Sequence, residues 1–265
     1  MNFFMGNGMV GPGKGEQVPH AAVNGIELFY EEQGEGPPVV LIHGIMGAPR
    51  FTFANLLHAL TPHFRVILPD LRGFGRTRHP KTTYHHAASA DDLAGLIQHL
   101  GVAPAHVIGH GMGGIIAQNL ALRHPQAVKS LVLLSTGSYV HKSFAEYFQR
   151  KILGYYDKFK DNGMVGEYNL ADDPINYLRW AEQAITDGSY ADTRERLPQI
   201  GCPVLAVHGE LDEQYPVAHA RLFKERLPRC RLEILPGRGH VLFFEAPELL
   251  AQAILSFLHD LEAGN

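Results

Sequence analysis

Histidine and aspartate are the residue types in this chain best suited to moving protons, and their placement indicates where its chemistry lies. The sixteen histidines are scattered and form no cluster with the spacing of a metal site. Cys202 and Cys230 have neither the spacing of a zinc site nor that of a redox CxxC pair. We therefore expect two reduced thiols, no metal and no cofactor.

Short segments rich in Gly, His and Asp directly follow apolar runs at five places along the chain. They read IHGIMG at 42–47, PDLRGFGRT at 69–77, HVIGHGMGG at 106–114, HGELD at 208–212 and GRGH at 237–240. If the apolar runs are strands of one parallel sheet, these segments meet at the carboxyl edge of that sheet, where ligands bind in open α/β folds. The sequence thus predicts a site built from loops that are far apart in the chain.

The elements that must position these loops alternate between strand and helix. Six short apolar strands are expected at 38–42, 65–68, 106–108, 130–134, 203–207 and 231–235. Amphipathic helices are expected near 51–60, 90–100, 114–123, 217–226 and 247–260, with Ser89 capping the second of them. A hairpin is expected at 21–23 and 26–31, joined across Asn24-Gly25. This alternation predicts a mostly parallel sheet covered by helices on both faces.

The alternation breaks once, and the break divides the chain. Residues 136–197 lack a strong strand pattern and are crowded with aromatic side chains at spacings that suit helices. We interpret this segment as a helical cap inserted into a core made of residues 21–135 and 198–265. Residues 1–20, rich in Gly and Met, are expected to form an N-terminal tail.

The segment at 106–114 resembles the nucleophile elbow of the α/β-hydrolase superfamily, in which a sharp turn between a strand and a helix lifts the nucleophile above the sheet. Gly109 and Gly113 occupy the places two residues either side of its centre, where small residues let strand and helix approach. The other four segments match landmarks of the same family in the same chain order, from roughly residue 21 to 258. The resemblance implies an α/β fold with a mostly parallel, doubly wound sheet and an inserted helical cap.

The resemblance also implies the identity of the site residues. His240 matches the catalytic base, and Asp212 matches the acid that orients it. Ile45 and Met112 match the residues whose backbone N–H groups form the oxyanion hole. The nucleophile position, which normally holds Ser, Cys or Asp, is occupied by Gly111.

A glycine at this position supplies no hydroxyl, so no acyl-enzyme can form at Gly111. Glycine accepts the positive φ of an elbow without a Cβ penalty. The nucleophile has thus been lost or removed, or Gly111 leaves space for a water molecule on which His240 acts as general base. An acidic C–H or O–H of the substrate is an alternative target for the same base.

Neighbouring polar residues are expected to play supporting parts. His110 is interpreted as a structural histidine that points away from the pocket. Ser135 and Thr136 end a strand near the pocket mouth, where either hydroxyl is a candidate for substrate binding. Asp70 and Arg72 are expected to pair and fix a loop.

These features favour a hydrolase that acts on a small carbonyl compound, through an ester, lactone or carbon–carbon bond, in a form without the serine. One alternative is a natural non-serine enzyme whose His240–Asp212 dyad activates water or deprotonates substrate, as in a lyase or cyclase. A second is a ligand-binding protein that keeps the pocket without turnover, although the intact dyad argues against it. The aromatic, mostly uncharged 136–197 segment favours an apolar or aromatic substrate.

The overall composition excludes other classes of partner. The formal net charge is −4, and no run of Lys and Arg is dense enough to bind a phosphate backbone, which argues against nucleic acid. Nowhere do eighteen apolar residues follow one another, and the N-terminal stretch lacks the pattern of a signal peptide. We expect a cytoplasmic protein that binds a small-molecule substrate but no nucleic acid and no membrane, with its oligomeric state left open.

Overall fold

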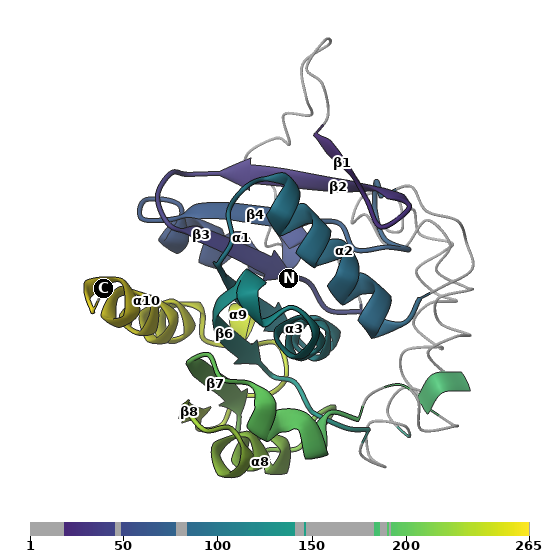
Figure 1. Ribbon diagram of the computed structural model, residues 1–265. Coiled ribbons are helices and arrows are strands. Elements are labelled where there is room, and N and C mark those ends of the chain that lie inside the picture. Colours follow the sequence, from purple (N-terminus) through teal and green to yellow (C-terminus); the bar gives the residue numbers. More distant parts are fainter. Residues whose placement is uncertain are drawn as a thin grey trace, which may run out of the picture.

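The computed structural model describes residues 19–45, 49–77, 84–140, 146, 183–185, 190 and 192–264. Its centre is one eight-stranded sheet in the order β1-β2-β4-β3-β5-β6-β7-β8 (Figure 1). The strands are β1 (His20–Val23), β2 (Ile26–Gln33), β3 (Pro38–Ile42), β4 (Arg65–Pro69), β5 (Ala105–His110), β6 (Val128–Leu134), β7 (Val204–Gly209) and β8 (Cys230–Leu235). β2 pairs antiparallel with both β1 and β4, and every other pairing is parallel. The predicted fold class is confirmed.

Helices cover both faces of this sheet. They are α1 (Pro49–Leu60), α2 (His86–His99), α3 (Met112–Arg123), α8 (Ala218–Arg226), α9 (Leu242–Glu245) and α10 (Pro247–Ala263), with 3₁₀ turns η1 (Pro125–Ala127) and η3 (Arg194–Gln199). α2, α3 and α8 pack on one face, and α1 and α10 pack together on the other (Figure 1). In β3, Val40 and Ile42 face the first layer, whereas Val39 and Leu41 face the second, because side chains alternate along a strand. Both faces are therefore apolar, as the continuous apolar runs predict.

The turn between β1 and β2 is the predicted Asn24-Gly25 turn. Its residues have φ angles of 45° and 76°, which Asn and Gly adopt more readily than other residues. The hairpin prediction is confirmed, and it places β2 beside β4 at one side of the sheet.

The start of α2 differs from the prediction. The helix begins at His86 with His85 at its N-cap, so Ser89 is buried within the helix and does not cap it. Asp92 is also buried, and it forms a bidentate ion pair with Arg72 at 2.6 Å. The acidic residues that follow Ser89 lie inside the helix and contact distant parts of the chain.

The predicted cap at 136–197 and the predicted tail at 1–20 fall largely outside the described residues. Two contacts at the ends of the 136–197 segment are described. Tyr139 forms an isolated antiparallel bridge with Asp192, and the Thr193 N–H donates to the Ser138 carbonyl at 2.7 Å. Residues near the two ends of this segment therefore contact each other.

Candidate active site

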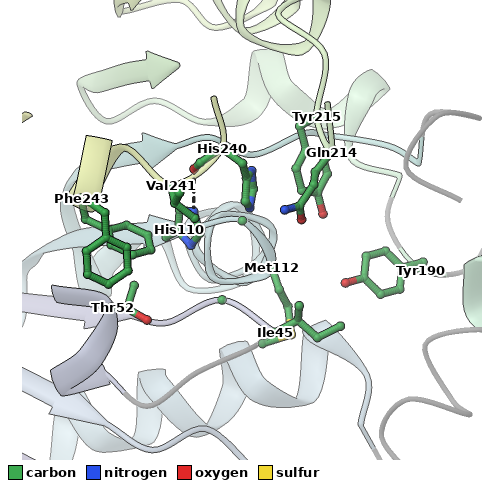
Figure 2. Close-up of a pocket in the computed structure, with 13 residues that line it drawn as sticks. Ile45, Thr52, His110, Met112, Tyr190, Gln214, Tyr215, His240, Val241 and Phe243 are labelled. Carbon is green, nitrogen blue, oxygen red and sulfur yellow. Dashed lines mark hydrogen bonds between the residues drawn. The ribbon is translucent and has the colours of Figure 1, made fainter. Parts of the chain in front are cut away.

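A cavity of about 140 Å³ opens where β3, β5, β7 and β8 end. Figure 2 shows Ile45 and Met112 on one side of it and His240, Tyr215 and Gln214 on the other. The described residues that line it are Gly44, Ile45, Thr52, His110, Gly111, Met112, Tyr190, Gln214, Tyr215, His240, Val241, Phe243 and Phe244. Four of the five predicted site residues line the cavity, and the fifth, Asp212, is hydrogen-bonded to His240.

Gly111 forms a sharp turn between β5 and α3. Its backbone angles are φ 53° and ψ −116°, a conformation that residues with a Cβ rarely adopt. A Cβ built on Gly111 would lie 3.5 Å from His240 Nε2, at ordinary van der Waals distance. A side chain at this position would therefore point at the imidazole, which is the geometry the elbow resemblance implies.

The glycines that flank this turn allow a close approach of three elements. A Cβ on Gly113 would lie 2.2 Å from the Ile42 carbonyl oxygen, and a Cβ on Gly109 would lie 2.3 Å from the Gly113 carbonyl oxygen. Neither distance is compatible with a side chain. The N-terminus of α3 thus packs directly on the backbone at the end of β3.

His240 and Asp212 form a hydrogen-bonded dyad. His240 Nδ1 lies 2.9 Å from Asp212 Oδ2, while Asp212 Oδ1 accepts the N–H groups of Gln214 and Tyr215, both at 2.9 Å. Because an ionised carboxylate only accepts hydrogen bonds, Nδ1 carries the proton and Nε2 presents its lone pair. That lone pair faces the Gly111 turn, which suits a general base.

The Asp212 carboxyl remains ionised although its side chain is fully buried. Burial raises its pKa, but the His240 charge and hydrogen bond, together with nearby His208 and the Tyr215 N–H, lower the pKa to below its ordinary value overall. Asp212 is therefore able to stabilise a protonated His240 during proton transfer.

The loop that carries His240 is fixed by a residue to which the sequence analysis assigned no role. Glu245 accepts the Gly239 N–H at 2.6 Å and the Val241 N–H at 3.2 Å, and so it holds the backbone on both sides of His240. Glu245 lies only four and six residues from the two N–H groups that it accepts, so this contact is local in the chain.

His110 corrects one expectation. It lines the cavity instead of pointing away from it, and its ring centroid lies 4.6 Å from that of His240. His110 Nε2 lies 3.2 Å from the His240 carbonyl oxygen (dashed in Figure 2). Burial and the neighbouring His240 lower the pKa of His110 to about 3, so it donates this hydrogen bond as a neutral imidazole.

The loop after β3 brings Ile45 to the cavity wall opposite His240. The preceding His43 is fully buried, with Nδ1 2.8 Å from the Gly44 carbonyl oxygen and Nε2 accepting the Leu71 N–H at 3.2 Å. Burial lowers the pKa of His43, which keeps it neutral in this bridging role. His43 thus ties the loop that carries Ile45 to the loop after β4.

Two further expectations are wrong. Ser135 and Thr136 are fully buried and absent from the cavity lining, and the Thr136 hydroxyl donates to the Gly111 carbonyl at 2.6 Å. Asp70 binds Arg76 at 2.9 Å rather than Arg72, which pairs with Asp92 instead. The Thr136 hydroxyl thus holds the backbone instead of binding substrate, and Asp70 and Arg72 each have another partner in place of one another.

Tyr190 and Gln214 are lining residues that the sequence analysis did not single out. Gln214 lies two residues after Asp212, so its place at the site follows from the acid's position. No local pattern in the sequence predicts the place of Tyr190 at the site, because its contacts there are with residues distant in the chain, His86 and Tyr215.

Within the described part of the chain, no group of three or more His, Cys, Asp or Glu side chains is arranged to hold a metal ion. None of the described helices is both long and apolar enough to cross a membrane.

The buried histidines predict a loss of stability in mild acid. Burial lowers the pKa of His86 to about 4 and that of His110 to about 3. At pH values between these pKa values and about 6.5, the unfolded chain binds more protons than the native one. The free energy of unfolding therefore decreases as the pH is lowered, by on the order of 2 kcal/mol per histidine at about pH 5. Urea midpoints measured from neutral pH down to about pH 5 should show this decrease, with a shallower slope for His86→Gln.

His58→Gln, on the exposed face of α1, is the control and should leave the slope unchanged. A midpoint that is independent of pH over this range would contradict the assignment of neutral buried histidines.

Comparison with known proteins places these features in context. A family described as "alpha/beta hydrolase fold" matches residues 37–165. A Caulobacter sp. (strain K31) protein classed by name as a carbamate hydrolase, RutD, is 32% identical over 88% of this chain and 96% of its own length. The 2-hydroxy-6-oxo-6-(2'-aminophenyl)hexa-2,4-dienoic acid hydrolase of Metapseudomonas resinovorans is 29% identical, over 88% of each chain. The solved structure of an enol-lactonase from Burkholderia xenovorans LB400 superposes with a TM-score of 0.75 at 26% identity, over 91% of this chain and all of that one (100%).

Proposed function

Since this chain belongs to the α/β-hydrolase superfamily and is a hydrolase of small molecules, we propose that it cleaves a small, apolar or aromatic carbonyl compound with water as the nucleophile. His240 is the general base in this proposal, Asp212 orients it, and the N–H groups of Ile45 and Met112 stabilise the oxyanion. Gly111 marks the place where a serine would otherwise stand.

The geometry of His240 against Gly111 carries the proposal. Nε2 faces the turn at a distance that would suit a side-chain Cβ, so the space beside it accepts an oxygen atom within hydrogen-bond reach. In a serine enzyme that oxygen is a hydroxyl. With glycine at the turn, a water molecule takes the same position relative to the base.

The proposed reaction proceeds through one tetrahedral intermediate. Nε2 removes a proton from water as the oxygen attacks the carbonyl carbon, and the negative charge moves to the carbonyl oxygen, which the two backbone N–H groups hold. Collapse of the intermediate breaks the bond to the leaving group, which takes the proton from Nε2. Asp212 stabilises the imidazolium between these two transfers.

The cavity supports a small substrate with apolar surface. Its volume of about 140 Å³ is close to that of a cavity that holds benzene. Its described lining is mainly apolar or aromatic, with polar groups from Thr52, Tyr190 and Gln214. The relatives named above are, by their names, a carbamate hydrolase, a hydrolase of a hydroxy-oxo-dienoic acid and an enol-lactonase. We propose carbamate, lactone, carbon–carbon and ester bonds for testing.

The test is a panel of phenyl esters, lactones, phenyl carbamates and a 2-hydroxy-6-oxo-dienoic acid, assayed for product release and for a covalent intermediate. We expect hydrolysis above the uncatalysed rate, no initial burst of phenol, and no labelling of the protein by a fluorophosphonate. A burst or a labelled protein would refute direct attack by water. Binding of panel compounds without turnover would instead indicate a ligand-binding protein.

A further inference from the structure

The chain just after β6 holds the backbone of the Gly111 turn. The Thr136 hydroxyl donates to the Gly111 carbonyl oxygen at 2.6 Å, and the Gly114 N–H donates to the same oxygen at 3.0 Å. The Gly111 N–H in turn donates to the Leu134 carbonyl at 3.0 Å. The peptide groups on both sides of Gly111 are therefore tied to other parts of the chain, one of them by a buried side chain.

The peptide that Thr136 contacts is the one that carries the Met112 N–H. In a planar trans peptide the C=O and the N–H point in opposite directions, so fixing the Gly111 carbonyl also fixes the direction of the Met112 N–H. Met112 lines the cavity opposite His240. A hydrogen bond accepted by the carbonyl also polarises the N–H of the same peptide and strengthens it as a donor.

We propose that Thr136 is a positioning residue for the oxyanion hole, acting through the Gly111–Met112 peptide. This inference rests on the proposed function, in which the Met112 N–H binds the oxyanion. Thr136 itself does not line the cavity, so it has no contact through which to bind substrate directly.

The backbone immediately before Thr136 supports this assignment. Ser135 has a φ of 42°, in the left-handed region that few residues other than glycine adopt, and its buried hydroxyl has no hydrogen-bond partner among the residues that the structure describes. Its N–H donates to the Val207 carbonyl of β7 at 3.0 Å, which holds the strained residue in place. Strain of this kind persists where the surrounding structure enforces it, and here it precedes the residue that contacts the Gly111 turn.

The packing and hydrogen-bonding roles of Thr136 can be separated by mutation. Its side chain packs against Gly114, where a Cβ would lie 2.5 Å from the Thr136 methyl group. Thr136→Ser and Thr136→Ala both remove that methyl group, and they differ from one another by one oxygen atom. A difference between these two variants therefore reports the hydroxyl alone.

Hydrolysis of p-nitrophenyl acetate by the full chain provides the first measurement. Thr136→Ala is expected to lower kcat about tenfold with KM within about twofold, because a misaligned donor acts mainly on the transition state. Thr136→Ser is expected to keep kcat within about threefold of the parent value. Equal kcat values for the Ser and Ala variants would overturn the proposal.

Benzoate binding, followed through the amide resonance of Met112, provides a readout that does not need turnover. The Ala variant is expected to shift this resonance and to weaken benzoate binding about fivefold, while the Ser variant retains both. Absence of turnover in the parent would refute the proposed function but leave this comparison valid. The positioning role would be refuted if the Thr136→Ala and Thr136→Ser variants had the same Met112 resonance and the same benzoate affinity. If Thr136→Ala does not fold, Thr136→Val replaces it, since Val lacks the hydroxyl but keeps the methyl group.

Discussion

Gly111→Ser is expected to convert this protein into an enzyme that forms an acyl-enzyme. The new Cβ would lie 3.5 Å from His240 Nε2, so the hydroxyl one bond beyond it comes within hydrogen-bond reach of the base. Loss of the nucleophile from a serine hydrolase lowers kcat by about 10⁶, and its restoration should recover several orders of magnitude of that factor with a short activated ester. A burst of p-nitrophenol from p-nitrophenyl acetate and covalent labelling by a fluorophosphonate would report the acyl-enzyme chemistry.

The same substitution should also destabilise the fold. The φ of 53° and ψ of −116° at Gly111 are strained for a residue with a Cβ, which predicts a decrease of about 1–2 kcal/mol in the free energy of unfolding. Gly111→Ala is the matched control, since it has the same strain but no hydroxyl. It should lose stability equally and give no burst. Destabilisation of both variants without a burst in Gly111→Ser would show that the pocket does not support acyl transfer. No change in either quantity would mean that Gly111 is not the elbow position.

His240→Ala is expected to abolish turnover in the protein as it stands. Without the imidazole no group in the described cavity lining takes the proton from water in the same geometry, and loss of a general base costs about 10²–10⁴ in rate. Asp212→Asn should also lower kcat sharply, because an amide that donates to Nδ1 would favour the tautomer with a protonated Nε2. Both variants are compared with the parent by kcat/KM for the best substrate of the panel.

Asp260→Asn on α10 is the control for these two changes, because its side chain is 75% exposed and is not among the residues that line the cavity. It should leave kcat/KM unchanged. Unchanged rates in both dyad variants would show that the His240–Asp212 pair takes no part in turnover and would refute the proposed mechanism.

The sequence by itself determined the elements and the chain order of the site. Strand periodicity and continuous apolar runs set β3 and the other parallel strands, since a strand buried on both faces needs apolar side chains in both directions. The Asn24-Gly25 pair determined the first hairpin through the positive φ angles that these two residues tolerate. The segments that end in Asp212 and His240 follow β7 and β8, so strand order alone brought the acid and the base to the same edge.

Only the tertiary structure decided which polar groups meet inside the molecule. Thr136 reaches the Gly111 carbonyl because β5 and β6 lie side by side, and His110 turns toward His240 because Phe243 and the His240 backbone surround its ring. Arg72 pairs with Asp92 on α2 instead of with its neighbour Asp70, because the fold brings these two distant segments together. Hydrogen bonds and ion pairs in a core are chosen by packing between distant segments, since burial makes an unpaired polar group costly wherever its partner lies in the chain.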